Sequence, residues 1–461
     1  MTRFSRWAGI ALAIGLIAIC AIGGGSARVD VTSLLIVRSA AVLTAAAMML
    51  LPRERGGHGG RAVLWFLSIL SLWMIAQAIP LPPAIWLSLP GHERFGDAAA
   101  AAGIAQPWRP ISVTPDLTLS ALADLVVPVA VALSVEAVRP RDQHWILAAI
   151  LAFGILSCLV GVVQVATGGL HYYIYHHLGA TGLFANRNHQ GAFLALCLPL
   201  LAVWRVEGTR HLPMLARNVL ASAAAALFVV MIVVGGSRAG LLLGAIGAVG
   251  FVALATGSAT GARIKRRWII AAAVVLACVA VLVLFGRATA LDRLFATGSI
   301  EGEARFDHTP LVVRIIRDFM PFGSGFGSFD PVFRIYEPDN FLNPGYFNHA
   351  HNDYLELVLT GGVPGALIFA GFGIYVVRRL LPRNWSAREP ADGALWRRAS
   401  ALALAILLLH SGVDYPLRVP SLAAVATCLV IWCLMPYKRR MKSTDRLPKV
   451  GGSPDRVVLA R

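Results

Sequence analysis

The chain has 461 residues, of which 57% are hydrophobic and only 14% are charged, and its mean hydropathy is +0.68. This composition excludes a water-soluble globular chain and predicts an integral membrane protein. The formal net charge of +17 would suit a nucleic-acid partner, but the Lys and Arg residues flank apolar segments, so we predict contacts with membrane lipids and none with nucleic acid.

Nearly uncharged apolar segments recur along the whole chain, and a helix needs roughly 20 such residues to cross a bilayer. A cleaved secretion signal is the alternative interpretation of the first segment; because further spans follow it, we predict an uncleaved span. We therefore predict an all-α polytopic membrane protein with about twelve transmembrane helices, at 7–25, 31–51, 62–79, 120–138, 145–166, 190–204, 217–234, 238–256, 268–285, 355–377, 399–413 and 419–436.

The positions of the basic residues predict the orientation of the chain. If the N-terminus is cytoplasmic, the inner segments hold most of the 41 Lys and Arg residues, including every lysine, as the positive-inside rule requires. We therefore predict that both termini are cytoplasmic and that the chain has four parts. These are 1–285 with helices 1–9 and an outer loop at 81–119; 286–352, a large outer loop between helices 9 and 10; 353–436 with helices 10–12; and 437–461, a basic cytoplasmic tail.

The outer loops hold the residue types that chemistry needs. Loop 81–119 is rich in proline and carries Trp86 and Trp108, which predicts irregular or interfacial helical segments that cap the bundle. The inner loops hold little except Arg, Pro, Gly and Ala, so any chemistry must face outward. All six cysteines lie in apolar spans, where they pack as small hydrophobic residues, and no disulfide framework follows.

Polar side chains gather in four outer clusters, at 182–189, 235–240, 301–329 and 349–356. A single arginine at the mouth of a helix is ordinarily an anchor in the headgroup region. The Gly-rich turn at 321–329 is weak evidence for a nucleotide site. Several outer cations with few partner acids nevertheless favour an anionic ligand. Arginine suits phosphate because its planar group stays charged and grips two oxygens at once.

The residues from His349 to Asp353 also have the HxHxD pattern that opens a metallo-hydrolase signature. That signature continues with a further histidine where this chain has Tyr354, and the remaining outer histidines lack the spacing of metal ligands. We therefore predict no metal and no other cofactor.

Taken in order along the chain, the four clusters resemble the O-antigen ligase and O-antigen polymerase superfamily, which also includes exopolysaccharide polymerases. The resemblance spans roughly residues 180–420, whereas the first five spans share only hydropathy with the family. The matching stretches are 182–189, Ser237-Arg238, Arg305 with 323–329, 351–355 with 360–365, and 410–420.

This resemblance implies a membrane-embedded, GT-C-like glycosyltransferase that has no nucleotide-sugar site and requires no metal. Members take a glycan from undecaprenyl diphosphate at the periplasmic face of the bacterial inner membrane and transfer it to an acceptor hydroxyl. A ligase uses the lipid A core as its acceptor, and a polymerase uses another lipid-linked repeat. The expected reaction is a single displacement with inversion at the sugar carbon.

The family pattern implies roles for individual residues. Arg238 and Arg305 occupy the family positions expected to bind the diphosphate, Arg187 is the third candidate, and Arg314 and Arg317 are weaker candidates. His351 is the expected general base because imidazole titrates near neutral pH; Asp353 or Glu356 is expected to orient its ring, and His349 is the alternative base. The candidate substrate-binding residues are Asn186, His189, His349, Asn352 and Arg418.

Two alternatives stay open at this point. Ligase and polymerase are not separated by these residues, and the stretch 171–177 is richer in His and Tyr than a dedicated ligase would require. A transporter is the alternative of another class, because twelve spans is a common transporter count. Transporters usually place ionisable groups near the midplane and show paired halves, whereas these spans hold almost no acids and the long loop follows the ninth span.

Overall fold

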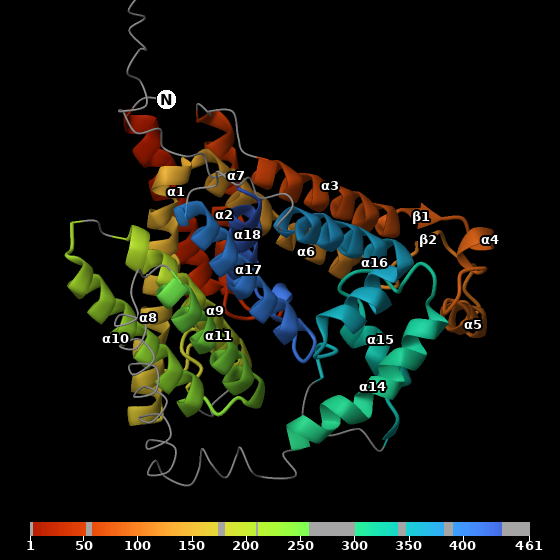
Figure 1. The fold of residues 1–461 in the computed structure, drawn as a ribbon. Helices are drawn as coiled ribbons and strands as arrows, with labels where there is room; N and C mark the ends of the chain where they lie inside the picture. The colour runs from red at the N-terminus through yellow and green to blue at the C-terminus, as the bar shows by residue number, and fades with distance from the viewer. Residues whose placement is uncertain are drawn as a thin grey trace, which may run out of the picture.

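The structure is a computed structural model that describes residues 3–51, 58–173, 180–208, 211–257, 300–339, 347–381 and 391–435. The described residues are mainly helical, with one two-stranded antiparallel ladder formed by β1 (Pro80–Leu81) and β2 (Arg109–Pro110) (Figure 1). Ten helices in this part of the chain are long and apolar enough to cross a membrane. The prediction of an all-α polytopic membrane protein is therefore confirmed.

The helices of the N-terminal half are α1 (Arg3–Gly23), α2 (Ser33–Leu50), α3 (His58–Ala78), α4 (Pro83–Trp86), α5 (Glu93–Ala101), α6 (Pro115–Asp124), α7 (Val126–Ala137) and α8 (Gln143–Thr167), with the 3-10 turn η1 (Pro140–Asp142). The helices that follow are α9 (Arg187–Glu207), α10 (Met214–Val234), α11 (Arg238–Gly257), α14 (Ile300–Asp318), α15 (Phe329–Tyr336), α16 (Asp353–Leu380), α17 (Ala391–Ser411) and α18 (Pro420–Leu434), with the 3-10 turn η4 (Pro416–Arg418).

The predicted spans correspond to helices wherever the structure describes them. The spans predicted as short, 190–204 and 399–413, are longer in the structure, at Arg187–Glu207 and Gly393–Ser411. The helix at 420–434 is a shorter apolar helix. The predicted span 268–285 lies outside the described residues.

Helix α9 forms the centre of the bundle. In the most apolar 18-residue stretch of this helix, 89% of the residues are buried inside the protein. The helix packs against α8, α10, α11 and α17. Gly191 and Gly240 permit a close approach of α9 and α11, because a Cβ atom at Gly191 would lie only 3.1 Å from the Cα of Gly240. Two glycines near the starts of α9 and α11 therefore bring those helix starts together.

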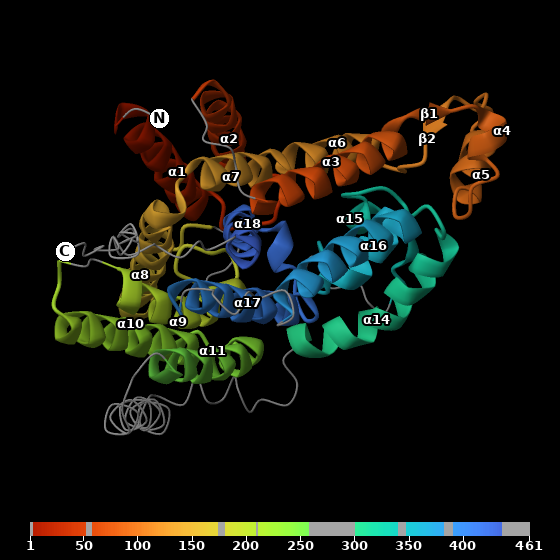
Figure 2. The same cartoon turned by 45° about the horizontal axis from the view of Figure 1, so that its top comes forward.

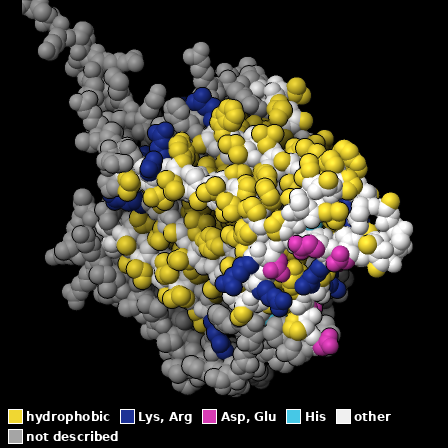
Figure 3. Space-filling view, turned by 90° about the vertical axis from the view of Figure 1, so that its right-hand side faces the viewer, with side chains coloured by type: hydrophobic (Ala, Val, Ile, Leu, Met, Phe, Trp, Pro, Cys, Tyr) yellow, Lys and Arg dark blue, Asp and Glu magenta, His cyan; other side chains and the backbone are white. Residues whose placement is uncertain are grey.

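A second group of helices extends from the bundle. In Figures 1 and 2, α3, α6 and α16 run alongside one another, with α14 and α15 packed on α16. The ring of Phe66 on α3 stacks on Phe372 of α16, with 4.4 Å between ring centroids. Figure 3 shows that this side of the protein has a broad apolar face between two groups of charged side chains, a basic group at the upper left and a mixed basic and acidic group at the lower right, as suits a lipid-facing surface.

The Gly-rich turn at 321–328 supports a break in α16. Gly362 has a φ of +63°, and the turn bonds to the opened backbone there: Gly325 N–H donates to Thr360 O, and Val363 N–H donates to Pro321 O. The side chain of Gln77 on α3 donates to Thr360 O at 2.9 Å. These bonds satisfy backbone groups that a broken helix would otherwise leave unpaired inside the membrane. The turn therefore has a structural role that fixes α14 and α15 on α16.

Candidate active site

Helices α9 and α16 begin at one place, and each start is capped by an asparagine. The Asn186 side chain accepts from Asn188 N–H at the start of α9, and the Asn352 side chain accepts from Tyr354 N–H at the start of α16. The Asn352 amide also donates to Gly412 O at 2.9 Å, which ties α16 to the segment after α17. Because α11 begins beside α9, three positive helix ends lie together, and such ends attract anions.

The carboxylate that contacts His351 is Asp414. His351 Nδ1 lies 3.2 Å from Asp414 Oδ1, and the two residues are 63 positions apart in the chain. This contact holds the proton on Nδ1, so Nε2 is the basic nitrogen. The His351 side chain is 13% exposed, whereas that of Asp414 is fully buried. His351 also has a φ of +49°, and such strain in a residue other than glycine is typical of functional sites.

Asp414 is held by several donors. Asn188 Nδ2 donates to its Oδ2 at 2.8 Å, and Tyr415 N–H donates to its Oδ1 at 3.1 Å. His189 Nε2 lies 3.6 Å from Oδ1, a separation that gives an electrostatic contact and no hydrogen bond. Burial raises the pKa of the Asp414 carboxyl, but His189 and His351 outweigh burial and hold this pKa well below its usual value. The group is therefore an anion at neutral pH.

His349 belongs to a second histidine–carboxylate pair. Its Nδ1 lies 3.0 Å from Glu356 Oε1, and Ala350 N–H donates to Glu356 Oε2 at 2.9 Å. Arg418 Nε lies 3.2 Å from Glu356 Oε1 and 3.4 Å from Asp353 Oδ1. This cation therefore neutralises charge at two buried acids.

These contacts correct one sequence-based expectation. Asp353 or Glu356 was expected to orient His351, but Asp353 accepts from Ser411 Oγ at 2.9 Å, and Glu356 pairs with His349. The reason is geometric: both acids lie in the first turn of α16 and point toward the 411–418 segment, whereas His351 precedes the helix cap. Asp414 was missed as the partner, although it stands within the stretch 410–420 that resembles the family.

Tyr415 separates the two pairs and was also missed. Its ring centroid lies 4.3 Å from that of His349, 4.9 Å from that of His351 and 5.0 Å from that of His189. The available sequence signal was that Tyr415 directly follows an acid, Asp414, within the stretch that resembles the family. The ring fixes the separation between three imidazoles, so it positions the site without supplying a charge.

The predicted arginines have different surroundings. Arg187 is the first residue of α9 and is partly buried, and Arg238 is the first residue of α11 and is exposed. Arg305 lies within α14, but its side chain lies outside the described residues. The structure thus brings Arg187 and Arg238 to neighbouring helix starts.

Arg314 is exposed on α14 and lies beside a different group. Burial and the neighbouring Asp318 raise the pKa of Tyr336 to about 12, while the charges of Arg94 and Arg314 act against that shift. Arg314 is therefore near the end of α15 and near Arg94 of α5. Its contacts do not link it to the histidine pairs.

Metal-ligand chemistry is available at a group other than the HxHxD pattern. His349 and His351 pair with separate carboxylates. Among the described residues, His189, His410 and Asp414 each offer one ligand atom, and these atoms lie within 4.8 Å of one another.

One family comparison bears on these residues. Residues 223–370 match the sequence model of the family described as O-Antigen ligase. The match includes Arg238, Arg305 and the first turn of α16 with His351, while Asp414 lies beyond it. No curated protein matches the sequence. The chain is thus a multi-pass membrane protein whose residues 223–370 match the O-antigen ligase family, and members of that family carry out glycosyl transfer of the ligase or polymerase type.

Proposed function

We propose that this protein transfers a glycan from undecaprenyl diphosphate to an acceptor hydroxyl at the periplasmic face of the bacterial inner membrane, with the lipid A core as acceptor. The observation that carries the proposal is the His351–Asp414 pair beside three helix starts, at 3.2 Å between Nδ1 and Oδ1. A basic imidazole next to an anion-attracting surface suits the attack of an alcohol on a sugar diphosphate.

The His351–Asp414 pair supplies the base. Nε2 of His351 takes the proton of the acceptor hydroxyl as its oxygen attacks the anomeric carbon. Asp414 holds the Nδ1 proton and stabilises the imidazolium that forms, because it is a buried anion 3.2 Å away. The bond from the anomeric carbon to the diphosphate oxygen breaks, and its electron pair leaves on that oxygen. Attack opposite the leaving group inverts the sugar carbon.

Arg187 and Arg238 are the proposed diphosphate ligands, together with Arg305. A diphosphate is already a good leaving group, so it needs stabilisation of negative charge more than it needs protonation. Guanidinium groups at the positive ends of α9 and α11 meet that need. Catalysis on this scheme uses no metal. Arg314 lies near Tyr336, in a different region, and stays a weaker candidate.

A reconstituted assay tests the diphosphate assignment. The full-length chain in liposomes receives an undecaprenyl-diphosphate-linked glycan and a lipid A core acceptor, and product is followed by mass spectrometry. Arg238→Gln is expected to lower transfer by about 10²-fold, as loss of a charge-stabilising donor does. The control is Arg334→Gln, because Arg334 pairs with Asp330 on its own helix at 2.8 Å. Wild-type transfer by Arg238→Gln would contradict the assignment.

Polymerisation is the second candidate, because the superfamily includes both reactions and the same residues would serve a lipid-linked repeat as acceptor. A deletion strain separates the two. Loss of long-chain lipopolysaccharide with accumulation of lipid-linked polymer supports ligation, whereas single-repeat products support polymerisation. The family match favours either reaction over transport.

The proposed topology has its own test. With cytoplasmic termini, the segment that carries α14 and α15 is periplasmic. A topology reporter inserted after Glu337 is expected to read periplasmic. A cytoplasmic reading would remove the lipid-linked donor scheme, because the two helices pack on α16 and lie on the same side as the start of that helix.

A further inference from the structure

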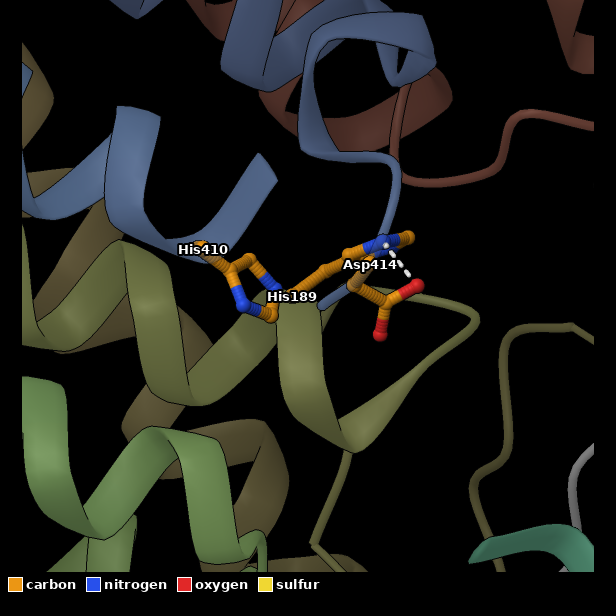
Figure 4. Close-up of side chains that lie close together, drawn as sticks. All are labelled: His189, His410 and Asp414. Carbon is orange, nitrogen blue, oxygen red and sulfur yellow. Dashed lines mark ion pairs between the residues drawn. The ribbon is translucent and has the colours of Figure 1, made fainter. Parts of the chain in front are cut away.

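Three buried side chains from distant parts of the chain meet next to the proposed base (Figure 4). His189 comes from the first turn of α9, His410 from the last turn of α17, and Asp414 from the loop that follows α17. Their exposed fractions are 1%, 0% and 0%. The ligand atoms that they offer lie within 4.8 Å of one another. Two imidazoles and a carboxylate are therefore concentrated away from water.

The imidazole of His189 is buried, and its nitrogens lack hydrogen-bond partners among the described residues. Nε2 of His189 points toward Asp414 Oδ1, and the two atoms lie 3.6 Å apart (Figure 4). A buried polar atom without a hydrogen-bond partner costs free energy, so such atoms ordinarily face a ligand or a water molecule. The gap between this imidazole and the carboxylate suits a small electrophile.

The donor set selects the class of that electrophile. Imidazole nitrogens with one carboxylate suit Zn²⁺ and related divalent transition-metal ions, whereas Mg²⁺ and Ca²⁺ prefer oxygen ligands. Zn–N and Zn–O bonds near 2 Å place neighbouring ligand atoms about 3.3 Å apart in a tetrahedral site. The 3.6 Å separation of His189 Nε2 and Asp414 Oδ1 is close to that value. We propose that His189, His410 and Asp414 form a binding site for a divalent transition-metal ion of the Zn²⁺ class.

Metal binding at this site opposes catalysis, an effect that rests on the proposed function. Asp414 Oδ1 already accepts from Tyr415 N–H at 3.1 Å and contacts His351 Nδ1 at 3.2 Å. A metal ion on the same oxygen takes one of its lone pairs and neutralises the charge that supports the His351 imidazolium. The site is therefore inhibitory: transfer runs without metal and slows when Zn²⁺ binds.

Metal binding is measured first, without substrate. The purified full-length chain is stripped with a chelator and dialysed against Zn²⁺, and bound zinc is counted by elemental analysis. Wild type is expected to retain one equivalent that His410→Gln and His189→Gln both lose. The matched control is His92→Gln, which removes an equally buried imidazole whose nitrogens face Pro90 O and Ile111 O. Equal zinc in wild type and both site variants overturns the proposal.

Two further readouts cover misfolding and separate this proposal from the proposed function. If the site variants do not fold, the X-ray absorption spectrum of the zinc-loaded wild type tests the site. A spectrum with nitrogen and oxygen ligands that include two imidazoles supports the site. Any other ligand set overturns the proposal. Saturating Zn²⁺ is expected to slow wild-type transfer by at least about tenfold, reversibly with chelator, and to leave His410→Gln unaffected. Bound zinc without any transfer activity supports the site and counts against the proposed reaction.

Discussion

The two histidine–carboxylate pairs that contact Tyr415 have similar geometry, but the two carboxylates have different charged neighbours. Glu356 shares a permanent cation, Arg418, with Asp353, and its whole side chain is enclosed at the start of α16. Asp414 contacts the imidazole of His351 and accepts from the Asn188 amide and from Tyr415 N–H. A carboxylate that contacts an arginine has less negative charge available to stabilise an imidazolium than one that contacts imidazoles and N–H groups. This difference favours His351 over His349 as the base.

The largest expected effect is the loss of the base itself. His351→Ala is expected to reduce transfer by about 10³-fold, within the range for removal of a general base. The matched variant His349→Ala removes the imidazole of the other pair and is expected to cost less than about tenfold. Rates per folded molecule in reconstituted membranes decide between them. A larger loss in His349→Ala would reverse the roles of the two pairs.

A smaller loss is expected when the partner of the base is changed. Asp414→Asn keeps the shape of the side chain but removes the charge that supports the imidazolium, so kcat is expected to fall by about 10²-fold with little change in KM. Steady-state kinetics with varied acceptor provide the measurement. If KM rises while kcat stays constant, Asp414 binds substrate and does not act through His351.

The Glu356 pair is expected to affect folding more than turnover. Glu356→Gln leaves the Arg418 cation with less compensation at a buried site, which costs about 3 kcal/mol in comparable broken pairs. The expected result is a lower thermal unfolding midpoint in detergent, with turnover of the folded fraction reduced only a few-fold. Wild-type stability combined with abolished turnover would show that Glu356 serves the chemistry.

The smallest expected effect is the pH dependence of the stability that Asp414 provides. Its folded-state pKa lies well below its usual value, because His189 and His351 outweigh the effect of burial. The stabilisation is therefore fully present above the unfolded value of about 3.9 and is lost only as pH falls below it. The difference in unfolding midpoint between wild type and Asp414→Asn is expected to stay constant from pH 8 to about pH 5. A difference that vanishes already near pH 6 would contradict the depressed pKa.

Most of the fold was predictable from sequence, because each span must satisfy its own backbone within the membrane and therefore carries its own apolar signal. The helices α1, α2 and α3 coincide with predicted spans for this reason. For loop 81–119 the sequence predicted only irregular or helical segments, since the ladder between β1 and β2 depends on pairs of residues 28 and 30 positions apart. The break at Gly362 was invisible in hydropathy.

The candidate site was predicted only in part. Resemblance to the family supplied His351, Arg187 and Arg238, and the roles of these residues stay predictions until they are tested. The partner of His349 was close in sequence, because Glu356 stands only seven residues later and contacts its Nδ1. The partner of His351 carried no such signal, because Asp414 stands 63 residues away on another element.

By itself, then, the sequence determined an all-α membrane protein that resembles this superfamily, because hydropathy and short motifs are properties of contiguous residues. Only the tertiary structure decided which acid serves which histidine. That choice depends on how closely α9, α16 and the end of α17 approach; the Asn352 bond to Gly412 ties α16 to the segment after α17, and the Asn188 bond to Asp414 ties that segment to α9. Ion pairs in a low-dielectric interior depend on distance, and distance is set by packing across the whole bundle.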